Sequence, residues 1–240
     1  MAEYSPMMQH YLKTHEEYKD CILFYRLGDF YEMFFDDALT ASRELDLTLT
    51  GRAGGNKEKI PMCGVPFHSA ESYIERLVHK GYKVAICEQI EDPKLAKGIV
   101  KRKIIKVITP GTITLENAVA SKQNNYIGCL TASDGIISIA LTDVTTGECL
   151  WADCAASEMG DVLFDILAVY EPSELIYANM GEYMEKVQQY LKGHLSQCTV
   201  TAFVVDDSVD YREQAKPYFA AEAFAAASRA GACIGMLLAY

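Results

Sequence analysis

The sequence lacks any uninterrupted apolar run of the roughly 18 residues that a membrane-spanning helix needs. It also lacks a basic and apolar leader at its start, where Ser5 and Pro6 instead mark the beginning of a helix. We therefore expect a cytoplasmic protein with no membrane partner. Half of the 240 residues are hydrophobic, which excludes a disordered chain and suffices for two medium-sized cores or one large core.

The cysteine spacings of zinc sites and disulfide frameworks are also missing. Eight cysteines are present, but no two are separated by two residues, and several lie in apolar runs where free thiols pack like small hydrophobic side chains. Cys63 with His68, and Cys149 with Cys154, come nearest to metal spacing, yet no second pair accompanies either. The pattern predicts free thiols and no metal site.

Basic residues are scarce, with 22 Lys and Arg against 33 Asp and Glu, and such a deficit argues against nucleic-acid binding by the chain as a whole. The deficit is uneven, because residues 1–118 hold 16 basic and 17 acidic groups whereas residues 119–240 hold 6 and 16. A basic stripe without acidic residues comprises Lys94, Lys97, Lys101, Arg102, Lys103 and Lys106. This stripe is either a solvated loop and strand edge or a phosphate-binding surface.

The first half of the chain alternates between strand and helix patterns. Apolar runs predict strands at 21–27, 84–90 and 103–109, and helical spacing predicts helices to about Tyr18, after Gly28-Asp29 and after Ser69. Residues 60–67, with two prolines, are predicted to form a constrained loop. Strands with both faces buried, separated by helices, indicate a mainly parallel or mixed sheet that helices cover.

A polar stretch at 114–124 is interpreted as a linker between a domain at 1–113 and a second domain at 125–240. The second domain begins with a predicted three-stranded meander at 126–132, 136–144 and 148–151. Helices near 158–170 and 181–192 then alternate with strands at 174–178 and 198–205, and an alanine-rich helix follows at 218–240. The predicted fold is α/β, and the second domain resembles a ribonuclease H-like layout.

Two enzymatic interpretations have weak support. The glycine-rich segment at 51–57 lacks a second glycine directly before Lys57, and Glu58 stands where a phosphate loop needs Ser or Thr for magnesium. A metal-dependent nuclease of ribonuclease H-like fold needs clustered carboxylates. The predicted strand at 126–132 contains none, and Asp134 and Asp143 lie in or near turns, where aspartate is expected for backbone reasons. The nuclease is the alternative function.

Residues 28–35, with the sequence GDFYEMFF, form the most informative segment and allow two interpretations. In the structural one, Asp29 and Glu32 form a helix capping box, and the aromatic residues fill the first core. In the functional one, Phe30 lies at a strand-to-helix turn, exposed enough to enter a DNA duplex, and Glu32 supplies a nearby hydrogen-bond acceptor.

Four long segments resemble the N-terminal portion of bacterial MutS mismatch-repair proteins, in the same order and at close to the same spacing. They are residues 21–38, 60–68, 81–93 and 101–113. The resemblance covers the first domain nearly end to end, and the second domain resembles the connector domain of the family by position and layout. The resemblance implies a mismatch-recognition domain followed by a connector.

The Phe-x-Glu motif of that family falls on Phe30-Tyr31-Glu32. By resemblance, Phe30 enters the minor groove and stacks on a mispaired or unpaired base, and Glu32 hydrogen-bonds to that base. This implication favours the functional interpretation of the segment. The candidates for contact with the DNA backbone are Arg52, Met62, Lys97, Lys101, Arg102, Lys103 and Lys106. Met62 is expected to flank Phe30, which acts as a wedge.

The resemblance further implies mismatched double-stranded DNA and MutL as partners, and a homodimer in the full-length protein in which only one Phe30 inserts. The ATPase of the family, which uses ATP and Mg, would lie beyond residue 240. This chain is then expected to be no enzyme and to hold no cofactor, and its acidic connector would relay conformational change.

Overall fold

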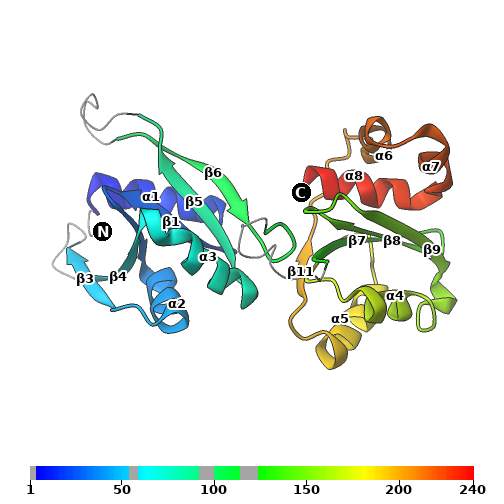
Figure 1. The fold of residues 1–240 in the computed structure, drawn as a ribbon, viewed down its shortest axis with the longest axis horizontal. Helices are drawn as coiled ribbons and strands as arrows, with labels where there is room; N and C mark the ends of the chain where they lie inside the picture. Colours follow the sequence, from blue (N-terminus) through cyan, green and yellow to red (C-terminus); the bar gives the residue numbers. More distant parts are fainter. Residues whose placement is uncertain (1–3, 54–58, 92–99, 114–123) are drawn as a thin grey trace. The chain divides into compact units, whose positions relative to one another are not determined.

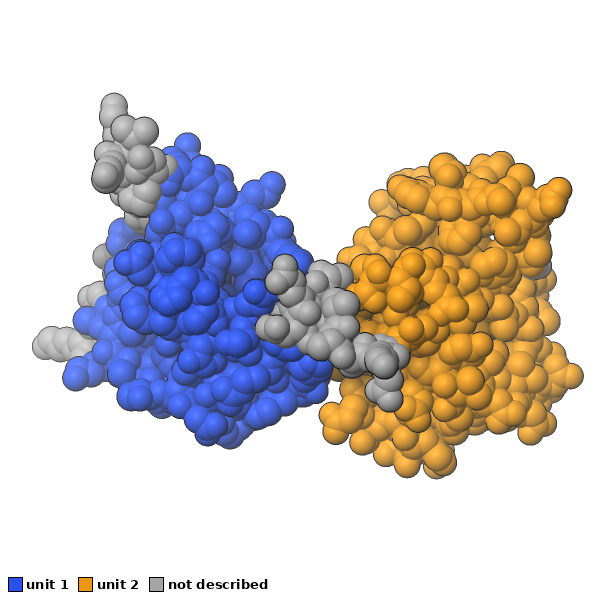
Figure 2. All heavy atoms as spheres, in the orientation of Figure 1, with its two compact units in different colours: residues 1–109 blue, residues 110–240 orange. Residues whose placement is uncertain are grey.

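The computed structural model describes residues 4–53, 59–91, 100–113 and 124–240. The chain divides into two compact units, Met1–Thr109 and Pro110–Tyr240, which Figure 2 colours separately. Each unit contains one mixed β-sheet with helices packed on it, so the predicted α/β class is confirmed. Pro110 and Gly111 make their contacts within the second unit, where the Pro110 oxygen accepts from Asn125 Nδ2 at 2.8 Å.

The sheet of the first unit has the strand order β3-β4-β2-β1-β5-β6 (Figure 1). Among the described strands of this unit, only β1 and β5 pair in parallel, and the other neighbours are antiparallel. The strands span β1 (Cys21–Leu27), β2 (Phe30–Phe34), β3 (Thr50–Ala53), β4 (Lys59–Pro66), β5 (Lys83–Gln89) and β6 (Arg102–Ile108).

Three helices cover this sheet: α1 (Pro6–Glu17), α2 (Phe35–Leu45) and α3 (Ala70–His79). Helix α1 begins where predicted, with the Ser5 hydroxyl accepting from Met8 N at 3.4 Å, and packs on one sheet face. Helix α2 covers the opposite face, where Cys63 Sγ donates to the carbonyl oxygen of Ala38 at 3.5 Å. A short 3-10 helix, η1 (Phe67–Ser69), leads into α3.

The predicted second helix is present as α2, but it begins at Phe35 and not directly after Asp29, because residues 30–34 form β2. The predicted loop at 60–67 is wrong, because most of these residues form β4. Gly28 has a φ of 57° and closes a two-residue turn, so the chain returns along β1. In β4, Pro61 lies beyond the last pair with β2 and Pro66 is the final residue. Both prolines therefore avoid the middle of the β2–β4 ladder, while Pro61 pairs with Gly51 of the edge strand β3.

The second unit has the strand order β11-β10-β7-β8-β9. The meander consists of β7 (Tyr126–Ser133), β8 (Ile136–Asp143) and β9 (Cys149–Ala155), which pair antiparallel. Strands β10 (Glu174–Ala178) and β11 (Thr199–Ala202) extend the sheet in parallel beyond β7. A meander that continues into parallel strands on one side is the ribonuclease H-like layout expected from the sequence.

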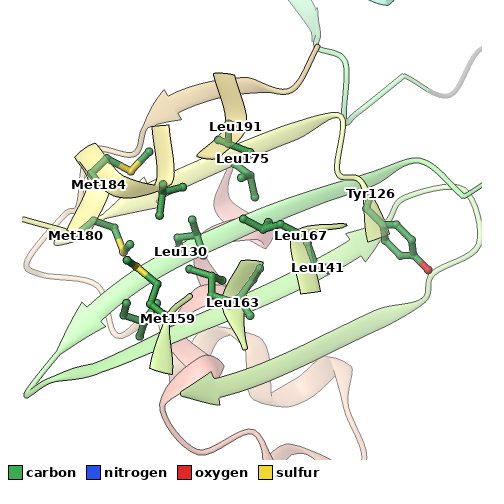
Figure 3. Packing of buried hydrophobic residues seen from close by; sticks show 13 residues of the cluster. Tyr126, Leu130, Leu141, Met159, Leu163, Leu167, Leu175, Met180, Met184 and Leu191 are labelled. Atoms are coloured by element: carbon green, nitrogen blue, oxygen red, sulfur yellow. The ribbon is translucent and has the colours of Figure 1, made fainter. Parts of the chain in front are cut away.

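Helices lie on both faces of this second sheet. Helices α4 (Leu163–Tyr170) and α5 (Tyr183–His194) enclose a core with Leu130, Leu141 and Leu175 from the strands (Figure 3). On the other face, α8 (Gly231–Ala239) packs with Cys129 and Ile176. The predicted continuous helix at 218–240 is wrong in its continuity. After α6 (Tyr211–Ala215) and η4 (Lys216–Tyr218), the tail is divided into α7 (Ala221–Ala226), η5 (Ser228–Ala230) and α8.

Candidate nucleic-acid interface

Phe30 is the first residue of β2, directly after the turn that joins β1 to β2. It pairs with Leu27 on one side and with Pro66 on the other, and its side chain is 45% exposed. The backbone N–H of Phe67 donates to the carbonyl oxygen of Asp29 at 2.9 Å and ties the turn to the end of β4. The ring is therefore not core filler, and no helix begins at Asp29.

Arg26 supports this turn from the opposite face of the sheet. Its side chain donates to the Gly28 carbonyl at 2.6 Å and pairs with Glu88 at 3.2 Å. Its guanidinium also lies 3.7 Å from the centre of the Phe67 ring. Tyr31 adds a hydrogen bond to Glu88 at 2.7 Å. These contacts fix the backbone beneath Phe30 and restrict its movement.

Glu32 lies two residues after Phe30 and therefore on the same face of the sheet. Its carboxylate Oε2 accepts from Arg52 Nη1 at 2.5 Å, and the Glu32 side chain is only 16% exposed. Arg52 belongs to β3, and β4 lies between β3 and β2. The ion pair thus crosses a strand, and the sequence carries no local signal for it because 20 residues separate its members.

Gly64 makes this crossing possible. It stands opposite Glu32 in the pairing of β4 with β2. A Cβ atom at this position would lie 3.0 Å from the carbonyl oxygen of Tyr31 and 3.4 Å from Glu32 Cγ. Glycine therefore leaves the space over β4 that the Glu32 side chain uses. No local sequence pattern points to a role for this glycine.

The structure places Arg52 and Met62, both predicted to contact DNA, differently with respect to the exposed Phe30 ring. Met62 is half-buried against the core under α1 and pairs with Phe34, whereas Pro66 is the residue opposite Phe30. The Arg52 side chain is 40% exposed and lies on the same sheet face as Phe30. The structure therefore brings Phe30, Glu32 and Arg52 to one face, with Met62 farther along β4.

The predicted basic stripe is divided between the two faces of the sheet. Arg102 shares the face of Glu32, with its guanidinium 5.0 Å from the Tyr25 ring centre and its Nε donating to the Arg26 carbonyl at 2.8 Å. Lys103 pairs with Glu88 and Lys106 with Ile86, which places both lysines on the opposite side. A register shift between Ile86 and Cys87 produces this arrangement.

Of the remaining residues of the basic stripe, the structure describes Lys101. Lys101 is exposed and pairs loosely with Glu91 at 3.9 Å, just before β6 begins. Lys94 and Lys97 lie outside the described residues.

Asp37 anchors the other end of β2 near the start of α2. Its carboxylate accepts from Leu23 N at 2.9 Å and from the Tyr11 hydroxyl at 3.1 Å, and His15 Nε2 lies 3.3 Å away. Burial raises the pKa of Asp37 above its ordinary value. This cluster connects α1, α2 and β1 behind the candidate interface.

The described residues give no support to a metal centre or a membrane span. No group of three His, Cys, Asp or Glu side chains among them could hold a metal ion, and the eight cysteines are free thiols. Asp134 lies in the turn between β7 and β8 with a φ of 51° and pairs with Arg229 at 3.0 Å, and Asp143 accepts from Thr145 in the turn after β8, so both have structural partners. No helix in the described ranges has the length and apolar character to cross a bilayer.

Residues 5–117 match the family model described as MutS domain I. The chain is 53% identical to the DNA mismatch repair protein MutS of Acetivibrio thermocellus over 192 residues, or 80% of this chain and 22% of that protein. It is 49% identical to the protein of the same name from Ruminiclostridium cellulolyticum over 214 residues, or 88% of this chain and 24% of that protein. The chain therefore spans less than a quarter of the length of either relative.

Proposed function

We propose that this chain, which belongs to the MutS family, forms the N-terminal part of a longer cytoplasmic mismatch-repair protein and inserts Phe30 into mispaired DNA. The observation that carries the proposal is the 45% exposure of the Phe30 ring on a turn that Arg26 and Phe67 hold in place. An exposed aromatic ring on a fixed backbone can stack without prior rearrangement of the protein.

The stacking contact provides affinity without requiring a particular base. Stacking of a base on an aromatic side chain contributes about 1–3 kcal/mol and is sequence-tolerant, since every base has a π-face. Inserting a wedge into paired DNA costs a few kcal/mol for unstacking, and that cost is lower where pairing is already weak. Phe30 would therefore select lesions mainly through the local deformability of the duplex.

Glu32 adds a second criterion on the same face of the sheet. A carboxylate near DNA phosphates is repelled unless it accepts a hydrogen bond from a base edge. Glu32 would thus weaken binding to ordinary duplexes and favour sites where the wedge exposes a donor. Phosphate contacts must come from basic residues, for which we propose Arg52, Lys97, Lys101, Arg102, Lys103 and Lys106. Met62 is not proposed beside the wedge, because it lies opposite Phe34 whereas Pro66 lies opposite Phe30.

The remaining features of the proposal concern the longer protein. We take residues 1–113 as the mismatch-recognition domain, 114–124 as a linker and 125–240 as the connector. The connector, with 6 basic and 16 acidic groups in residues 119–240, is a poor surface for DNA and better suited to a protein partner such as MutL. Homodimer formation and an ATPase that uses ATP and Mg would belong to domains outside this chain.

The test is the substitution Phe30→Ala in the full-length protein. Affinity for a G·T mismatch and for the matching paired duplex is measured over a range of salt concentrations. We expect the preference for the mismatch to disappear while salt-dependent binding to paired DNA persists, because phosphate contacts remain. The proposal is wrong if the variant keeps the preference.

Leu39→Ala provides the matched control for this experiment. Leu39 lies on α2 and its side chain is also 45% exposed, so both substitutions remove an apolar side chain of equal exposure from the same unit. We expect the control to retain the mismatch preference of the unaltered protein.

A further inference from the structure

We infer that Arg52 is the counter-ion of Glu32 and that it affects mismatch discrimination through that carboxylate, beyond any contact of its own with a phosphate. The inference rests on the proposed roles of Phe30 and Glu32. It assigns Arg52 as a positioning residue for the carboxylate.

The geometry favours this role because the guanidinium already has a close partner. Arg52 Nη1 lies 2.5 Å from Glu32 Oε2, and the two side chains are 40% and 16% exposed. The carboxylate is thus the more enclosed partner, and Arg52 covers it from β3. The space over Gly64 lets the two charges meet across β4. The Glu32–Arg52 ion pair therefore depends on three strands, because the intervening strand β4 must have a glycine at this position.

The ion pair fixes the direction of the carboxylate. Arg52 engages Oε2, which leaves Oε1 as the oxygen that can accept from a base edge. A charge-assisted hydrogen bond restricts the rotamer of Glu32 before DNA binds, so less conformational entropy is lost in the complex. Without Arg52, the same side chain would have to be ordered at the moment of binding.

The ion pair also reduces the electrostatic penalty for approaching DNA. An unpaired carboxylate beside Phe30 would meet the phosphate backbone with a full negative charge, whereas the paired groups are close to neutral. Arg52 would therefore lessen, without abolishing, the repulsion between the Glu32 carboxylate and the duplex. Its removal should reduce DNA affinity most strongly when Glu32 is present.

A double-mutant cycle separates this role from direct phosphate contact. The full-length protein is compared with Arg52→Ala, Glu32→Gln and the double variant, using G·T and paired duplexes at several salt concentrations. We expect Arg52→Ala to lower affinity for the G·T duplex by about tenfold in the unaltered background and by less than about twofold in the Glu32→Gln background. Arg52→Lys should restore part of the loss, since it keeps the charge without the planar fork.

Equal losses in both backgrounds, accompanied by a smaller salt dependence, would show a plain phosphate contact and overturn the inference. That result would leave the role of Phe30 untouched, because the Phe30→Ala experiment tests it separately. If Arg52→Ala lowers the melting temperature, the cycle is repeated with Arg52→Lys and Arg52→Gln, and the same comparison of losses decides.

A control cycle uses Arg43 and Glu44, an ion pair at 2.9 Å on α2. Substituting either residue removes a charge from the same unit on the face opposite to Phe30. We expect Arg43→Ala and Glu44→Gln to show no coupling in DNA affinity. Coupling of similar size in this control would mean that the cycle reports net charge, which would also overturn the inference.

Discussion

Gly64 stands directly opposite Glu32 where β4 pairs with β2, and the side chain of Glu32 occupies the space beside it. The substitution Gly64→Ala should therefore displace Glu32 or separate the two strands. We expect the preference for mismatched DNA to fall severalfold and the free energy of unfolding to fall by about 1–3 kcal/mol, as for other overpacked positions. Duplex-binding and urea-unfolding measurements check the two effects.

Gly160→Ala is the control for this substitution. A Cβ atom at Gly160 would meet no heavy atom within 4 Å, so the added methyl group has room. Unchanged discrimination in Gly64→Ala, at full stability, would contradict the view that the glycine positions Glu32.

Asp37 gives a prediction for the dependence of stability on pH. Burial raises its pKa above the ordinary value of 3.8, so the folded protein holds this proton to a higher pH than the unfolded chain does. The stabilisation is present below the unfolded-state pKa and is lost as pH rises through the folded-state pKa. Asp37→Asn carries no such proton, and its free energy of unfolding should lack this decline.

The measurement is urea unfolding of both proteins from acidic to neutral pH. The difference between them reports Asp37 together with its direct partners Tyr11 and His15, because the other charged groups are shared. We expect the unaltered protein to lose stability relative to Asp37→Asn as pH rises above about 4. A constant difference over the whole range would contradict the assignment.

Lys103 tests the contribution of β6 to nonspecific binding. It is exposed and lies on the sheet face opposite to Glu32, so we propose a contact with the DNA backbone and none with a base. Lys103→Ala should weaken binding to mismatched and paired DNA by the same factor. The slope of log affinity against log salt should shrink by about 0.9. Lys19→Ala, before β1 begins, is the control and should change neither quantity.

A change in mismatch preference without a change in the salt slope would contradict this role for Lys103. Such a result would place the lysine at the base-reading contact, on the face where the register does not put it.

The sequence correctly predicted the helices and strands whose capping residues and apolar patterns match their position in the folded protein. The serine and proline at the start of α1 act as a cap and a first turn, and the apolar runs of β1 and β5 are buried on both faces. In contrast, Asp29 and Glu32 have the spacing of a capping box but lie in a hairpin and a strand. The positive φ of Gly28 favoured the turn over a helix start, which the local pattern alone could not reveal.

The sequence named candidate site residues, but it could not specify the contacts between them. The resemblance drew attention to Phe30 and Glu32, and the exposure of the ring agrees with the role expected from it. The pairing of Glu32 with Arg52 depends on strand register, which no local sequence pattern specifies. The opposite directions of Arg102 and Lys103 follow from strand alternation, but the position of Lys106 depends on a bulge.

The turn before Phe30 connects β1 and β2, which are the two central strands of their six-stranded sheet. Bent DNA would exert an elastic force on the ring. This force would be transmitted to β1 and β2, each of which is hydrogen-bonded to a strand on both sides. Phe30 can then move away only if the middle of the sheet opens. Opening the sheet costs much more free energy than moving a surface loop. The exposed Phe30 ring therefore projects from the part of the sheet that is hardest to open.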